Sequence, residues 1–165
     1  MRLLVVNGVM PTTAAFALAQ TGTAIKTMLQ IKGLVPLKVV EWGISFPASA
    51  AAAPPKVELL TTGTVFATVT TLAEADVSKF GAAADLAADI LTFGTAATGF
   101  TSTAEGTITA TKPLDGLAQI PPTAYFSKWF PLGQEPIIYK GDAGRIRVTS
   151  AVDYAVSCWM RLEVA

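Results

Sequence analysis

The chain has 165 residues, with twelve basic and twelve acidic side chains, no histidine and one cysteine. This length suits a single domain that buries about two thirds of its unfolded surface. The balanced charge lacks the basic patch that nucleic-acid binding requires, so nucleic acid is not expected as a partner. Alanines supply much of the 52% apolar fraction, and no apolar run approaches the about 18 residues of a membrane span, so no membrane partner is expected.

The residue types also limit the chemistry. Without histidine the chain lacks the commonest general base, the usual catalytic triads and most zinc sites. The lone Cys158 excludes an internal disulfide, and its place in an alternating apolar pattern predicts a buried structural thiol. We therefore expect no enzyme, no catalytic residue, no cofactor and no metal.

The N-terminal segment MRLLVVNGVM begins with an apolar run that Asn7 and Gly8 soon break, so a signal peptide is not expected. The run predicts a first strand followed by a loop. We assign residues 1–24 to an N-terminal arm and residues 25–165 to a single β-sandwich domain. Leu3, Leu4 and Val5 are expected to add a strand to a neighbouring subunit, because main-chain hydrogen bonds need no particular side chains.

The dominant pattern beyond the arm has a period of two. In KVVEWGISF, residues 38–46, it predicts a strand with Val40, Trp42 and Ile44 on one face and Val39 and Glu41 on the other. Further short β-branched segments follow, separated by Gly, Pro and Asp. This spacing predicts an all-β protein, an antiparallel β-sandwich.

Two segments depart from the strand pattern. Residues 71–94 predict one long loop with at most a short helix near 82–90, and residues 94–107 predict a flexible, hydroxyl-rich connection. The acidic pairs Glu74/Asp76 and Asp85/Asp89 match no calcium loop and are interpreted as solvated.

The C-terminal third supplies most candidate contact residues. KGDAG, residues 140–144, predicts a corner between strands, and Ile146 and Val148 alternate inward, so Arg145 and Arg147 are expected to point outward towards carboxylates of a neighbouring subunit.

Three more side chains join this set of interface residues: Trp159 and Arg161 on the final strand, and Trp129. Tryptophan and arginine are enriched at contact hot spots. The alternative that Trp159 packs against its own chain stays open.

Several motifs carry a resemblance to a known group. VVEWGISF, KVELL, ATVT, TAATGFTSTAEGTITA, IPPTAYFSKWFPLGQEPII and GRIRVTSA resemble small β-sandwich proteins encoded among the virion genes of tailed bacteriophages, over about residues 26–164. The resemblance implies a jelly-roll-like domain that acts as a head decoration protein. Such a protein binds the major capsid protein across adjacent subunits and occupies the capsid surface after assembly in the host cytoplasm. The resemblance also implies a homo-oligomer, with a trimer expected at threefold positions.

Two other functions remain open at this point. A tail fibre or baseplate module that recognises host surface glycans would use Tyr125, Trp129 and Tyr139 as a sugar platform. A lyase or glycosidase would rely on tyrosines and carboxylates such as Glu135 and Asp142.

Overall fold

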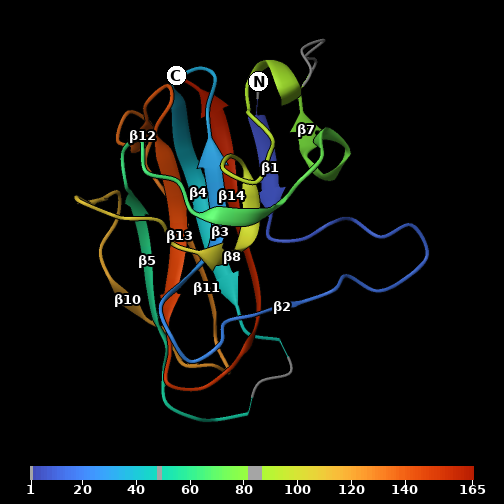
Figure 1. Ribbon diagram of the computed structural model, residues 1–165, viewed down its shortest axis with the longest axis vertical. Coiled ribbons are helices and arrows are strands. Elements are labelled where there is room, and N and C mark those ends of the chain that lie inside the picture. Colours follow the sequence, from blue (N-terminus) through green and yellow to red (C-terminus); the bar gives the residue numbers. More distant parts are fainter. Residues whose placement is uncertain (1, 48–49, 82–86) are drawn as a thin grey trace.

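The computed structural model describes residues 2–47, 50–81 and 87–165. These residues form two antiparallel sheets that pack face to face as a sandwich (Figure 1). The predictions of an all-β class and of an antiparallel sandwich are confirmed.

Sheet 1 is built around the two longest strands, one from the first half of the chain and one from its C-terminus. Its spatial order is β11 (Tyr125–Trp129), β4 (Leu37–Ser45), β14 (Ala155–Val164), β1 (Arg2–Val6) and β7 (Ser78–Phe80), with β12 (Ile137–Ile138) on β4 and β2 (Ala19–Gln20) on β14. Every pairing in this sheet is antiparallel.

Sheet 2 forms the opposite layer. Its spatial order is β10 (Ala118–Gln119), β5 (Lys56–Thr61), β13 (Ala143–Thr149), β3 (Lys26–Lys32), β8 (Gly99–Ala104) and β6 (Thr68–Thr71), with β9 (Lys112–Pro113) on β5. Two short 3₁₀ helices, η1 (Glu74–Asp76) and η2 (Ala87–Asp89), lie in the connections.

The core lies between the two sheets, where the inward-facing side chains of both layers meet. Sheet 1 contributes Trp42, Ile44 and Met160, and sheet 2 contributes Leu59 and Ile146, all fully buried. Burial of such apolar side chains is the main stabilising contribution to a fold of this kind.

The N-terminus corrects one prediction. Residues 2–6 are not part of an arm: they form β1, which lies between β14 and β7 in its own sheet, with Leu3 and Val5 buried in the core. Asn7 extends this attachment, because its side chain donates to the Val156 carbonyl and accepts from the Cys158 N–H. The segment that leaves the body is the loop after β1, which projects from the sandwich before β2 (Figure 1, blue).

A register shift in β4 corrects the predicted faces of that strand. Arg161 pairs with Glu41 and the next residue, Leu162, pairs with Val39, so Val40 is an extra residue of the kind found in a β-bulge. Val39 therefore joins the core, and Val40 lies with Trp129 and Arg161 on the other side.

Two predicted loops contain strands. Residues 78–80 of the long 71–94 segment form β7, and residues 99–104 of the predicted flexible connection form β8 within sheet 2. The helix predicted near residues 82–90 falls partly on residues 82–86, which lie outside the described residues, and Ala87–Asp89 form a 3₁₀ turn. By contrast, the corner predicted at residues 140–144 is confirmed, with Gly141 at a φ of 81° and the Asp142 N–H bonded to the Tyr139 carbonyl.

Within the described residues, no helix has the length and apolar character needed to cross a membrane.

Candidate functional site

Strand alternation places a distinctive set of side chains on the outer face of sheet 1. Along β14, Cys158 and Met160 point into the core, so Trp159 and Arg161 point outward. On the edge strand β11, which β4 separates from β14, Tyr125 and Trp129 are exposed on the same side.

Four aromatic rings gather on this face. Tyr125 is 67% exposed, Trp129 57% and Phe80 41%, while Trp159 is half-buried between them. We call this surface, defined by Phe80, Tyr125, Trp129 and Trp159, the aromatic face. Large exposed apolar groups on one surface of a folded domain are characteristic of an interaction site.

Gly43 allows the tryptophan at the centre of the aromatic face to lie close to the sheet. Gly43 pairs with Trp159, and a Cβ atom there would overlap the indole ring of Trp159 and lie 2.8 Å from the Phe126 carbonyl oxygen. Tyr125 stacks beside the indole, with ring centroids 5.4 Å apart and an interplanar angle of 29°. The two rings are thus held in place before any partner binds, which lowers the entropy cost of binding.

A nearly buried carboxylate connects the rings below the surface. Glu41 Oε1 accepts a hydrogen bond from Ser127 Oγ at 2.6 Å and one from the indole N–H of Trp159 at 3.2 Å. Its other oxygen lies 2.5 Å from Arg161 Nε in an ion pair. Glu41 therefore contacts side chains on both strands next to β4: one on β11 and two on β14.

Arg161 in turn lies between two of the exposed rings. Its Cζ atom is 5.3 Å from the centroid of Phe80 and 5.6 Å from that of Trp129. Both distances are in the range of cation–π attraction. The guanidinium joins the two sides of the aromatic face, because Phe80 is on β7 and Trp129 on β11.

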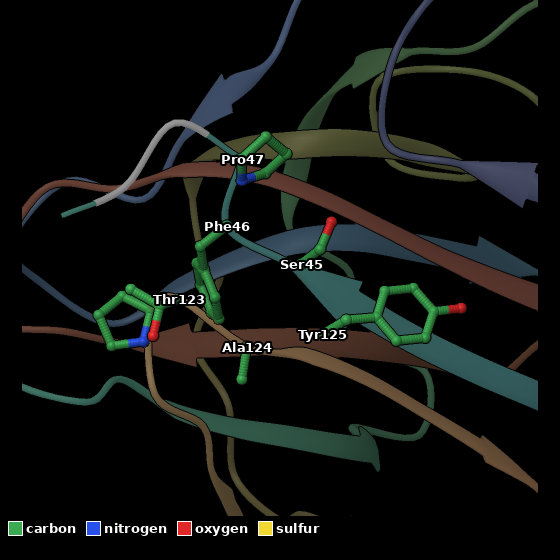
Figure 2. A pocket seen from close by; sticks show the side chains of 7 residues that line it. Ser45, Phe46, Pro47, Thr123, Ala124 and Tyr125 are labelled. Atoms are coloured by element: carbon green, nitrogen blue, oxygen red, sulfur yellow. The ribbon is translucent and has the colours of Figure 1, made fainter. Parts of the chain in front are cut away.

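A shallow hollow of about 340 Å³ adjoins the aromatic face at the start of β11. Figure 2 shows it between the end of β4 and the segment leading to Tyr125, with the Phe46 ring near Ala124 and the Tyr125 side chain pointing away from both. Its lining mixes apolar and hydroxyl-bearing side chains and contains no charged side chain.

The outer face of sheet 2 is different because the chain itself covers it. Gln30 on β3 binds the backbone of Ala67 and Ala97, and Arg145 on β13 donates to the Val65 carbonyl at 2.6 Å. Glu105 lies over the same side chain, with its Oε2 atom 3.2 Å from Arg145 Nη1. The central strands β3 and β13 of sheet 2 are therefore covered, whereas the outer face of sheet 1 offers exposed aromatic rings to a partner.

The expectation that Arg145 and Arg147 face another subunit is wrong for Arg145. The alternation is as predicted, but Arg145 is 0% exposed because Glu105 and the residues around Val65 lie over it. Arg147 is partly buried and pairs with Glu58 of the adjacent strand at 3.0 Å. The carboxylates predicted on a neighbour come from the same chain.

The other predicted interface residues divide by strand face. Trp129, Trp159 and Arg161 come together on the aromatic face, and Leu4 lies beside Arg161 in register. Leu3 and Val5 point the opposite way into the core and are buried, so their predicted availability to a neighbour is wrong.

Sequence reasoning missed three members of the site. Phe80 was placed in a loop, Glu41 was read only as a polar position in a strand, and Gly43 was given no role. The detectable signal was the motif EWG in β4: a small residue in a central strand permits a large ring on the neighbouring strand.

One carboxylate of the acidic pairs has a structural role. Asp76 is buried, not solvated, and its carboxylate accepts from the N–H groups of Met10 at 3.0 Å and Ala73 at 2.9 Å. Asp85 lies outside the described residues. Cys158 is confirmed as a buried thiol, and burial raises its pKa. Among the described side chains, no group of His, Cys, Asp and Glu is placed to hold a metal ion.

No protein-family model, curated protein or solved structure matches this chain. The fold and the site together define an all-β sandwich that carries a preordered aromatic face on one sheet.

Proposed function

We propose that the protein is a structural, non-catalytic virion protein that binds a protein shell through the aromatic face. The observation that carries the proposal is the difference between the two outer sheet faces: the chain covers the central strands of sheet 2 and leaves four aromatic rings on the face of sheet 1. Tryptophan, tyrosine and arginine in such a setting are the residues that dominate protein–protein contacts.

The identity of the shell rests on the resemblance of the strand and turn motifs to virion proteins of tailed phages. In this proposal the protein decorates the head by binding across adjacent major capsid protein subunits. Because it would bind only the assembled lattice, it stabilises the shell by mass action. A closed homo-oligomer, a trimer at threefold positions, would present several copies of the aromatic face to the lattice.

Co-sedimentation with purified head shells that lack the protein tests the proposal. Wild-type protein should pellet with the shells, and Trp129→Ala combined with Tyr125→Ala should reduce the affinity by tenfold or more, as expected for hot-spot truncation. Tyr139→Ala is the matched control, since Tyr139 is 64% exposed but lies outside the aromatic face. Failure of wild-type protein to pellet, or an equal loss in the control, would overturn the proposal.

A second function, recognition of host glycans by a tail module, is favoured by one observation. Ser45 and Ser127 lie in register beside Tyr125 and Gly43 on the same face as the rings. A sugar could stack its C–H face on Tyr125 or Trp129 while hydroxyl groups bind these serines, the combination of apolar walls and few polar groups found in ligand sites.

Antibody-gold labelling of intact virions separates the two functions. Gold distributed over the head supports shell binding, whereas gold confined to the tail supports glycan recognition. Virions without any label would contradict both.

A further inference from the structure

A small hollow lies at one end of the aromatic face, where β1, β4, β7, β11 and β14 approach one another. Its volume is about 170 Å³, and it is lined by Arg2, Leu3, Val40, Phe80, Trp129 and Arg161. The lining combines two guanidinium groups with apolar and aromatic walls. The β-bulge in β4 helps to form it, because the register shift places Val40 on this side of the sheet.

Each arginine has a carboxylate close to its Nε atom. Arg161 Nε lies 2.5 Å from Glu41 Oε2, and Arg2 Nε lies 3.2 Å from Glu163 Oε2. No residue in the described part of the chain accepts a hydrogen bond from the terminal Nη1 or Nη2 atoms of either arginine. The donor pairs at the ends of both guanidinium groups are therefore unused at a hollow that both residues line.

The surroundings orient the Arg161 donors. Phe80 and Trp129 flank the guanidinium, at 5.3 Å and 5.6 Å from its Cζ atom, and Glu41 holds the opposite edge. A guanidinium fixed in this way offers two parallel N–H groups, which match the two oxygens of a carboxylate. The two native carboxylates nearby are already paired, so they do not occupy these donors.

The size of the hollow indicates what kind of carboxylate fits. Sites for small-molecule ligands have volumes of about 300–1,000 Å³, well above the volume here. A single side chain is the better match: its carboxylate meets Arg161 and Arg2, and its methylene groups contact Val40 and the aromatic walls.

We propose that this hollow receives an aspartate or glutamate side chain of the protein that docks on the aromatic face. The inference rests on the proposed function, since it names the chemistry of the partner's contact at the same surface. The aromatic rings supply the apolar part of the interface, and the arginine hollow fixes the register by accepting one acidic side chain. Charge-assisted bidentate contacts give this kind of geometric specificity.

Carboxylate binding can be measured without any shell. Sodium acetate is titrated into ¹⁵N-labelled protein against sodium chloride at equal ionic strength, and the indole N–H of Trp129 and the Nε–H of Arg161 are followed by NMR. We expect saturable shifts of both signals with acetate and none with chloride. Arg161→Lys keeps the charge but loses the fork, so it should abolish saturation, whereas Arg147→Lys on sheet 2 should not.

The same variants then go into the shell assay. Arg161→Lys should weaken shell binding by about tenfold or more, and Arg147→Lys should leave it unchanged. Trp129→Leu is the second variant, for the case in which Arg161→Lys does not fold. It removes a wall of the hollow without touching the Arg161–Glu41 pair, and it should also reduce acetate binding. Shifts that are equal in chloride, or that persist in both the Arg161 and Trp129 variants, would overturn the carboxylate site.

The two proposals fail separately. Acetate binding by a protein that does not pellet with shells would remove the proposed function and leave the carboxylate site. Shell binding without saturable acetate binding would remove the site and leave the function.

Discussion

Arg145 carries its charge into a position where its side chain has no contact with solvent, and Glu105 is the only carboxylate that pairs with it among the described residues. The Arg145 Nη atoms also donate to the carbonyls of Val65 and Glu105. Removing one partner of a buried ion pair leaves the other charge uncompensated, which costs about 3–5 kcal/mol.

We therefore expect Glu105→Gln to lower the free energy of unfolding by about 3 kcal/mol, the lower end of that range, because water reaches part of the Glu105 side chain. Urea denaturation measures the loss. Glu58→Gln is the matched control: it neutralises the carboxylate that pairs with Arg147, at a site with more exposure, and should cost no more than about 1 kcal/mol. Equal losses in both variants would show that Arg145 does not depend on Glu105.

Glu105 should also make stability depend on pH. Burial raises the pKa of this carboxyl, but hydrogen bonds from Ser102 and Thr27 and the charge of Arg145 outweigh burial and bring the pKa below its ordinary value of 4.5. A carboxylate whose pKa is lower in the folded state stabilises the fold above its unfolded pKa, and this contribution disappears as the pH falls through the folded pKa.

The urea midpoint of wild-type protein is therefore expected to fall as the pH is lowered below 4.5. Glu105→Gln should reduce that dependence but not remove it, because the pKa of Asp115 is also lowered: burial raises it, but hydrogen bonds from Lys128 and Trp42 outweigh that effect. An unchanged pH profile in the variant would exclude Glu105 as a contributor.

At the scale of elements, the central position of β1 determines what the N-terminus contributes. An arm that leaves the domain can be removed without loss of the fold, but β1 is hydrogen-bonded to β14 on one side and β7 on the other. Deleting residues 1–7 should therefore abolish cooperative thermal unfolding, because it exposes the core around Leu3 and Val5, leaves β7 without a partner and leaves one side of β14 unpaired.

Shortening the projecting loop is the control for that deletion. Replacing residues 11–15 with two glycines keeps both β1 and the Met10–Asp76 hydrogen bond, and should preserve a cooperative transition followed by circular dichroism. A folded protein after deletion of residues 1–7 would mean that β1 is dispensable, as an arm would be.

Gly43 in β4 tests how the aromatic face is ordered. Gly43→Ala places a methyl group against the Trp159 ring and the Phe126 carbonyl oxygen, so we expect a loss of about 1–3 kcal/mol and a changed near-ultraviolet circular dichroism signal. Gly116→Ala, where a Cβ meets nothing within 4 Å, should change neither quantity. The same signal in Gly43→Ala and wild type would show that Trp159 does not rest on Gly43.

The elements that sequence predicts well are those whose side-chain pattern is decided locally. The alternation in β13 and β14 correctly separates Ile146 and Val148 from the arginines, and Cys158 from Trp159. Partners are decided elsewhere in the chain: nothing near Arg145 in sequence indicates that Glu105 will cover it. The β-bulge cannot be predicted from the local sequence either, because the extra residue at Val40 depends on the pairing with Arg161 and Leu162 of the distant strand β14.

Short strands were missed for a related reason. Apart from Phe100, β8 consists of small and hydroxyl-bearing residues, and its place in sheet 2 comes from pairing with β3 and β6. Gly99 permits that approach, because a Cβ atom there would overlap the Thr70 carbonyl oxygen of β6. Tertiary pairing decides the state of such a segment more than its intrinsic propensity does.

At the scale of the whole molecule, the two sheets have unequal outer surfaces, and this difference determines which side can bind. Residues 65–67 and Glu105 bind the side chains of Gln30 and Arg145 on the outside of sheet 2. Sheet 1 leaves its rings uncovered and its edge strands β7 and β11 at the two ends of the aromatic face. A shell bound as proposed would cover sheet 1 and leave sheet 2 in solvent.

Hydrogen exchange measured by mass spectrometry tests this orientation on the intact protein. Shell binding should slow exchange in peptides that cover β7 and β11, because a docked partner excludes water from their exposed strands, and should leave peptides covering residues 105–111 unchanged. Protection of 105–111 without protection of β11 would place the partner on sheet 2 and contradict the proposed face. The same measurement tests the role of Arg161. Arg161 contacts Phe80 on β7 and Trp129 on β11, so Arg161→Lys should reduce the protection from exchange that shell binding gives to both strands.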